Sequence, residues 1–260
     1  MSDPILKRYY LDIMSTGIDV HIGLNDVPLL ADPEGNGVRT ILPVNEWLAP
    51  GVNTITLRIA WPESKQHEPG KAELKVFLFE ADLEQELPEP KTVLAELVWP
   101  PPGAPELYPR KLEEPFKIEP ALPTKLWEEA EPIQAVGNAD QAAILALVEH
   151  LRRALLANDL DTALRLLNYR WQEDARANGL NLEELQTAVR EQYTYMLSEP
   201  SPHSTPLDPE DASFILGADK RIVKVQAPNN DEAIVIETEE GRYHIPIYAS
   251  KILGRWTIVR

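Results

Sequence analysis

The residue types that most often carry chemistry are sparse in this chain and are not grouped. Its 260 residues include five histidines and no cysteine. Without cysteine there is no thiol nucleophile, thiolate metal site or disulfide. No two histidines have the i, i+4 spacing that places two metal ligands on one helix face. We therefore expect surface or hydrogen-bonded histidines, not metal ligands, at His21, His67, His150, His203 and His244.

The sequence motifs of common catalytic sites are missing as well. There is no phosphate-binding glycine loop, no G-x-S-x-G turn and no local signature of a Ser-His-Asp triad. The acid-rich residues 80–89 lack the D-x-D-x-D-G order of a calcium loop, so we interpret them as a solvated loop. We expect no cofactor and no metal.

Tryptophans in the first half offer a different kind of site. Aromatic faces stack on the apolar faces of sugars, so Trp47, Trp61, Trp99 and Trp127 could form a sugar platform. Tryptophans of a β-sandwich more often lie in its core, and we favour that interpretation.

The charge of the chain excludes several partners. The net charge is −17, and both halves are acidic, with −11 over residues 1–134 and −6 over residues 135–260. Nucleic-acid binders need a basic face, and anionic membrane surfaces repel acidic proteins. The N-terminus lacks the pattern of a signal peptide, and no apolar run has the length of a membrane span. We expect a cytoplasmic protein, whose charge serves solubility or attracts a basic protein partner.

Residues 40–61 give the clearest structural signal. A proline-glycine turn at residues 49–53 precedes residues 54–59, which alternate with period two. Ile55, Leu57 and Ile59 share one face, as in a two-layer β structure with one wet face. Similar patterns predict strands at residues 5–13, 18–24, 27–30, 72–79 and 92–99.

Three segments carry a resemblance to a known group of folds. LNDVPL at residues 24–29, PVNEWL at residues 43–48 and PGVNTI at residues 50–55 follow one another in the order seen there. This part of the chain resembles the jelly-roll β-sandwiches of the galactose-binding-like group. The resemblance covers roughly residues 5–80 and implies an all-β sandwich. It does not identify a ligand.

The proline-rich region leaves two interpretations open. Nine of the 24 prolines lie between Pro100 and Pro132. The region is either an extended linker or a set of sandwich edge strands, where proline is tolerated. We favour edge strands, because a solvated linker would not carry Trp99, Phe116 and Trp127. The first domain is then residues 1–134.

The second half has the pattern of an α+β domain spanning residues 138–260. Apolar spacing predicts helices at residues 140–157, from Asn158 to Gly179, and at residues 182–197 with Asn181 as N-cap. Strands are predicted at residues 220–226, 232–238, 242–249 and 255–259. Their short connections indicate an antiparallel meander.

Three helices followed by such a sheet resemble the ketosteroid-isomerase-like cone of nuclear transport factor and SnoaL-type proteins. LLANDLDTALRLL, within residues 145–167, and GRWTI at residues 254–258 carry the resemblance. It implies three helices packed on a curved sheet, a pocket between them and a homodimer through the sheet. Enzymes of this family place an acid and an aromatic residue or histidine in the pocket. The candidates here are Tyr169, Trp171, Asp174, Tyr193, His244 and Tyr248.

Two hypotheses about function follow. The first is a non-enzymatic cytosolic binding protein, more specifically an immunity or adaptor protein that masks a basic partner. It is based on the missing catalytic motifs and the acidic charge. The alternative is a small-molecule isomerase, dehydratase or hydrolase of the ketosteroid-isomerase type, which requires an open apolar cavity with a buried carboxylate.

Overall fold

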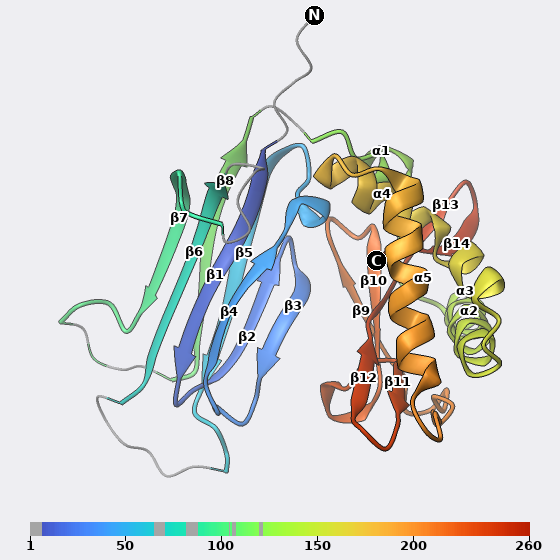
Figure 1. Ribbon diagram of the computed structural model, residues 1–260. Coiled ribbons are helices and arrows are strands. Elements are labelled where there is room, and N and C mark those ends of the chain that lie inside the picture. Colours follow the sequence, from blue (N-terminus) through green and yellow to red (C-terminus); the bar gives the residue numbers. More distant parts are fainter. Residues whose placement is uncertain (1–6, 65–70, 82–87, 104, 106–107, 120–121) are drawn as a thin grey trace, which may run out of the picture. The chain divides into compact units, whose positions relative to one another are not determined.

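The computed structural model divides the chain into two compact units, Met1–Pro123 (unit 1) and Thr124–Arg260 (unit 2). The structure describes residues 7–64, 71–81, 88–103, 105, 108–119 and 122–260 (Figure 1). The two units are described separately below.

Unit 1 is sandwich-like and contains two antiparallel four-stranded sheets. One sheet has the strand order β4-β1-β6-β7 and the other has the order β3-β2-β5-β8. The strands are β1 (Arg8–Thr16), β2 (Asp19–Leu24), β3 (Val27–Asp32), β4 (Val38–Pro43), β5 (Gly51–Ala60), β6 (Glu73–Ala81), β7 (Thr92–Trp99) and β8 (Arg110–Ile118). A short 3₁₀ helix at Asn45–Trp47 lies between β4 and β5.

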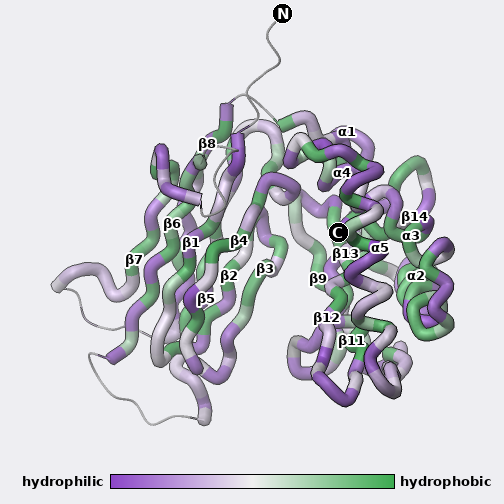
Figure 2. The backbone as a smooth tube through the Cα atoms, viewed as in Figure 1, coloured by the Kyte–Doolittle hydropathy of each residue, from purple (hydrophilic) through white to green (hydrophobic). Residues whose placement is uncertain are grey.

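Period-two alternation builds the core of unit 1. Ile55, Leu57 and Ile59 of β5 are buried as predicted, and the inward residues of β1, β2 and β6 join them in one cluster. Figure 2 shows hydrophobic and hydrophilic residues alternating along these strands. β5 begins at Gly51, earlier than predicted, because residues 51–53 already pair with residues 116–118 of β8.

Part of the proline-rich region is an edge strand. β8 pairs antiparallel with β5 along its whole length, with Pro115 opposite Thr54. As the outer strand of its sheet, β8 tolerates a residue without an N–H group. Its Phe116 and Ile118 lie in the core together with Trp99. Residues 124–134 belong to unit 2, where Ile133 joins that unit's core, whereas the sequence-based boundary assigned them to the first domain.

Unit 2 opens with helices, and their ends follow local capping chemistry. They are α1 (Leu126–Glu129), α2 (Asn138–Leu156), α3 (Leu160–Leu166), α4 (Asn168–Asn178) and α5 (Leu182–Ser198). The side chains of Asp159 and Asn181 accept hydrogen bonds from the first turns of α3 and α5, and Gly179 ends α4 with a left-handed φ of 63°. The prediction of one helix from Asn158 to Gly179 is wrong. The chain leaves helical geometry at the buried Leu167, so residues 138–198 contain four helices, not three.

Antiparallel strands follow the helices of unit 2. They are β9 (Ser213–Gly217), β10 (Ile222–Gln226), β11 (Ile234–Glu237), β12 (Arg242–Ile245), β13 (Ile247–Ile252) and β14 (Arg255–Ile258). β14-β13-β10-β9 form one sheet, and β11-β12 form a separate two-stranded sheet. The sequence pattern predicted no strand at Ser213–Gly217.

The expected hairpin between residues 220–226 and 232–238 is wrong. β10 pairs with β13, and β11 pairs with β12. These four strands therefore act as two interrupted arms of one hairpin. Residues 227–233 bulge from one arm, and Pro246, which lacks an N–H group, separates β12 from β13 on the other.

The interior of unit 2 is filled by apolar side chains. Leu167, Trp171, Tyr193 and Met196 belong to the same buried cluster as Val223 and the inward residues of β11 and β13. Such close packing is typical of protein cores. Among the described residues, no helix is long and apolar enough to cross a membrane.

Candidate functional site

A connected network of polar side chains in unit 2 lies on the hairpin β11–β12. The strands read IVIE and RYHI, and Ile234, Ile236 and Ile245 face the core. Alternation places Val235, Glu237, Arg242 and His244 on the opposite face, where Glu237 is in register with Arg242 and Val235 with His244. This outer face of β11–β12, together with residues 203 and 231, is the hairpin surface discussed below.

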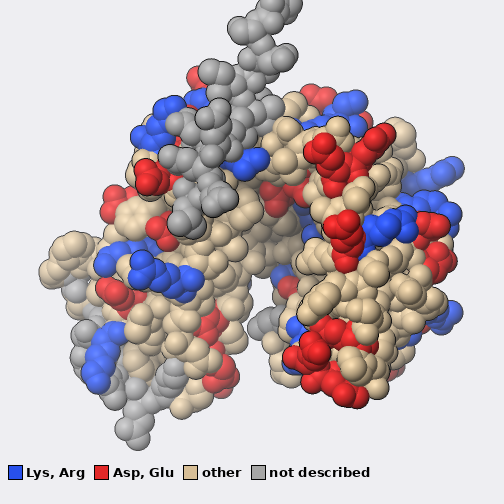
Figure 3. Space-filling model, in the orientation of Figure 1, with Lys and Arg blue, Asp and Glu red and all other residues tan. Residues whose placement is uncertain are grey.

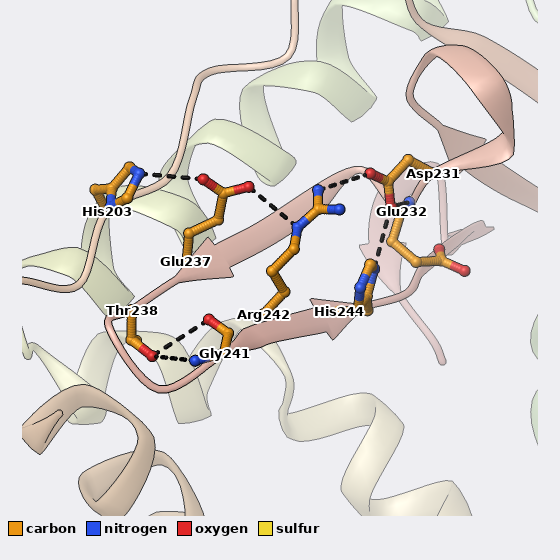
Figure 4. A network of polar contacts seen from close by, with 8 residues as sticks. All are labelled: His203, Asp231, Glu232, Glu237, Thr238, Gly241, Arg242 and His244. Carbon is orange, nitrogen blue, oxygen red and sulfur yellow. Dashed lines mark hydrogen bonds and ion pairs between the residues drawn. The ribbon is translucent and has the colours of Figure 1, made fainter.

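Five side chains of the hairpin surface form a continuous chain of polar contacts, with an arginine–carboxylate ion pair at each side of Arg242 and a histidine–carboxylate contact at each end (Figure 4). The order is His203, Glu237, Arg242, Asp231 and His244, and each neighbouring pair lies 3.1 Å apart. Figure 4 shows the guanidinium of Arg242 between the two carboxylates. His203 is held in place by two backbone hydrogen bonds with Glu237, in both directions.

The hairpin surface is accessible to solvent. The side chains of His203, Arg242 and His244 are 65%, 53% and 46% exposed. Exposed ion pairs stabilise a protein by at most about 1 kcal/mol each, because water and salt screen them. The network therefore contributes little to folding, and its groups can meet another molecule at low cost.

The tip of the hairpin is fixed to the end of α5. The buried carboxylate of Glu199 accepts hydrogen bonds from the hydroxyls of Tyr243 and Thr238. The bond to Glu199 raises the pKa of Tyr243 to about 12, because ionisation of the phenol would break it. Thr238 also accepts hydrogen bonds from the backbone N–H groups of Glu240 and Gly241 and so shapes the turn.

A buried ion pair joins Lys224 to Glu232, the residue that follows Asp231 of the hairpin surface. Lys224 of β10, only 7% exposed, has its Nζ 3.1 Å from Glu232 and 5.5 Å from the ring centre of Tyr248. Burial, followed by the nearby Glu232 carboxylate, raises the pKa of Tyr248. The second oxygen of Glu232 is buried and accepts no hydrogen bond from any described residue. Lys224 neutralises this carboxylate, so Glu232 is not a free base.

The six residues suggested by the cone resemblance lie in different environments. Trp171 and Tyr193 are core residues, and Tyr169 donates a hydrogen bond of 2.9 Å to Glu129. Asp174 accepts a hydrogen bond from the side chain of Asn178, and His244 belongs to the hairpin surface. Burial raises the pKa of Tyr169, Tyr193 and Tyr248, so all three phenols stay protonated at neutral pH.

The carboxylate of α4 that is fully buried is Glu173, not Asp174. It accepts hydrogen bonds from the backbone N–H groups of Lys125 and Leu126, at 2.9 and 2.8 Å, and from Arg176 at 2.6 Å. Glu173 thus caps the short helix α1 from a distance of 48 residues along the chain. With both oxygens engaged, it holds structure together and is not available as a base.

Sequence reasoning missed most of the hairpin surface. Arg242, Glu237 and Asp231 carry no motif, although the hairpin between residues 232–238 and 242–249 was predicted, and the pairing of β11 with β12 confirms it. The alternating polar positions of IVIE and RYHI, together with the predicted pairing of the two strands, were the available signal for Glu237 and Arg242.

The tryptophans of unit 1 do not gather on one surface. Trp99 is buried, and its ring centroid lies 4.8 Å from that of Tyr108. The ring centroid of Tyr108 lies 5.5 Å from that of Trp61. Trp47 packs against the sandwich core, whereas Trp127 belongs to α1 of unit 2. These positions favour the core interpretation over a sugar platform.

Within the acid-rich segment, Glu80 pairs with Lys7 at 2.9 Å, and residues 82–87 lie outside the described residues. The parts of the chain that the structure describes contain no cluster of three or more metal-binding side chains.

Comparison with family models, with curated proteins and with solved structures gives no match to this chain.

Proposed function

We propose that this chain is a non-enzymatic binding protein whose hairpin surface engages a basic protein partner. The observation that carries the proposal is the placement of charge in unit 2. Its core is a cluster of apolar side chains, and its buried carboxylates Glu173, Glu199 and Glu232 are bound by groups of the same unit. A connected chain of charged and histidine side chains lies on an accessible hairpin.

The hairpin surface and the adjoining turn have a negative balance. Asp231, Glu237 and the exposed Glu239 and Glu240 stand against the single guanidinium of Arg242, a net charge of −3 when both histidines are neutral. Figure 3 shows acidic side chains gathered at the end of unit 2 where β11 and β12 lie. Negative potential of this kind accelerates association with a cationic protein and suppresses binding of acidic ones.

An immunity or adaptor protein that masks a basic effector is the specific form of this proposal. The net charge of −17 supports it, since complementary charge gives fast capture of a basic target. A cytoplasmic location belongs to the same proposal.

The small-molecule isomerase, dehydratase or hydrolase is the alternative function. It requires an open apolar cavity that contains an acid–base group. Trp171 and Tyr193 are buried in the apolar cluster that the helices and strands share, Glu173 is engaged by three donors, and Glu232 is neutralised by Lys224. These observations favour a binding protein over an enzyme.

The finer fold assignments belong to the proposal as well. Eight strands in two four-stranded sheets support a jelly-roll relationship for unit 1, since jelly rolls are built in this way. Amphipathic helices followed by an interrupted antiparallel hairpin support a ketosteroid-isomerase-like relationship for unit 2, with dimerisation through the sheet.

The test is capture of partners from the native host with three forms of the full chain at physiological salt. The forms are the unmodified chain, Glu240→Lys in the hairpin turn and Glu96→Lys on the exposed side of β7. The two variants change charge equally, so Glu96→Lys controls for net charge. We expect one basic protein to be captured by the unmodified chain and by Glu96→Lys, and to be lost with Glu240→Lys. Capture of no protein, or equal capture by both variants, contradicts the proposal.

A further inference from the structure

We infer that unit 1 contains a second binding site, a cationic groove that takes a small organic oxyanion, a carboxylate or a phosphate monoester. The groove lies on the sheet β3-β2-β5-β8 and has a volume of about 370 Å³. His21, Arg58, Arg110 and Lys111 line it, together with the apolar Ala60 and Pro109. It is distinct from the hairpin surface and does not depend on the proposed function.

Strand register brings three of the basic side chains together. Arg58 of β5 is directly opposite His21 of β2 on one side and Lys111 of β8 on the other. Directly paired residues of adjacent antiparallel strands have Cβ atoms about 5 Å apart. A small anion seated over Arg58 can therefore contact all three side chains at once.

A row of like charges across a sheet costs stability unless something neutralises it. His21 pairs with Asp19 at 3.2 Å, and Lys111 pairs with Glu113 at 2.5 Å. Neither Arg58 nor Arg110 forms an ion pair with any residue that the structure describes. The groove thus holds three permanent cations and no acidic residue among the described residues that line it, in a chain whose net charge is −17.

Two other grooves of unit 1 make the contrast clear. Lys7 lines a groove of about 350 Å³ and pairs with Glu80, and Lys75 lines one of about 330 Å³ and pairs with Glu73. Those cations already have carboxylate partners. Arg58 retains a planar fork of donors, which matches the two oxygens of a carboxylate or phosphate.

The walls of the groove indicate the rest of the ligand. Ala60 and Pro109 offer apolar surface beside the guanidinium groups. An anion that carries a short apolar or aromatic group fits this combination better than inorganic phosphate, because it can bury that group against them.

The test uses the full chain and three probes, followed by amide chemical shifts. The probes are phenyl phosphate, benzoate and the neutral benzyl alcohol. We expect at least one anion to give saturable shifts at β2, β5 and β8, and benzyl alcohol to give none there. Tighter binding of phenyl phosphate assigns the site to phosphate monoesters, and tighter or equal binding of benzoate assigns it to carboxylates.

Matched variants separate a built site from general attraction. Arg58→Gln should weaken binding about tenfold or more, since it removes a charged pair of donors. Arg39→Gln removes an equal charge from the exposed side of β4, in the other sheet, and should change binding less than about twofold, because solvent screens it. Arg110→Gln serves as the second groove variant, and a melting curve checks that each variant folds. The inference is overturned if neither anion saturates, if benzyl alcohol shifts the same amides, or if Arg39→Gln weakens binding as much as Arg58→Gln.

Discussion

Replacing Asn53 should strongly destabilise unit 1, because its buried side chain binds the loop that precedes β5. Asn53 is fully buried, and its side chain makes four hydrogen bonds. The amide oxygen accepts from the N–H of Ala49 at 2.8 Å and from the side chain of Asn25 at 2.7 Å. The amide nitrogen donates to the carbonyls of Ala49 at 3.0 Å and of Gly51 at 3.2 Å.

Replacing Asn53 with alanine removes all four bonds. A buried polar group left without a partner costs about 1–3 kcal/mol. Three backbone groups and the side chain of Asn25 lose a partner, so at about 1 kcal/mol each the expected loss of unfolding free energy is about 3–5 kcal/mol. That is a large share of the stability of a single domain, which is typically about 5–15 kcal/mol.

The assay is denaturant unfolding of the full chain, combined with amide hydrogen exchange to localise the effect. Protection should fall in β2, β5 and β8 and stay unchanged in α2 and α5. Asn53→Asp, which keeps the shape but removes both donors and buries a charge, should be about as destabilising. Glu96→Ala, at an exposed position of β7 in the same unit, should change stability by less than about 0.5 kcal/mol. A loss below about 1 kcal/mol for Asn53→Ala would refute the reasoning, because the loop would then satisfy its polar groups without the amide.

Three further predictions concern unit 2. The fragment 124–260 should unfold at a higher denaturant concentration than the fragment 138–260. The shorter fragment lacks α1, whose backbone N–H groups donate hydrogen bonds to the buried Glu173. Equal unfolding midpoints would contradict this prediction. The phenol of Tyr243 has a pKa raised from 10.0 to about 12 by its bond to Glu199, so this bond stabilises the fold fully below pH 10 and is lost as the pH rises through about 12. Several buried tyrosines ionise late, and in an ultraviolet titration Tyr243→Phe should remove the one that ionises near pH 12; an unchanged curve would argue against the bond. Hydrogen bonds from the arginines three and four positions later, Arg152 the stronger, lower the pKa of Glu149 from 4.5 to about 2. This contribution is present above pH 4.5 and fades as the pH falls towards 2, so the stability of Glu149→Gln should fall less steeply there; parallel pH profiles would count against it.

Structure that depends on neighbours in the chain could be read from the sequence. The alternation of Ile55, Leu57 and Ile59 predicts a strand with one buried face, and the structure confirms it. Asn181 caps α5 and Gly179 ends α4, as their positions beside apolar helical stripes predict. Each of these features is governed by backbone conformation and side-chain period within a few residues.

Elements without a local signal were missed. β9 is a five-residue edge strand, and it turns into β10 through Ala218, Asp219 and Lys220, which all have positive φ without being glycine. Such a turn carries none of the glycine or asparagine-glycine pattern that announces a hairpin. The helix break at Leu167 also has no sequence signal, because leucine favours a helix. Its side chain is buried in the core at the point where the chain bends.

The sequence by itself determined the acidic character of the chain, the β-then-α+β order of its elements and the absence of common catalytic motifs, because composition and short-range periodicity suffice for these. Only the tertiary structure decided which polar residues meet. The register of β11 against β12 aligned Glu237 with Arg242, and the register of three strands aligned His21, Arg58 and Lys111. Register is set by packing of whole faces against a core, so no residue carries it alone, and a shift of one position would send every one of these side chains to the opposite face.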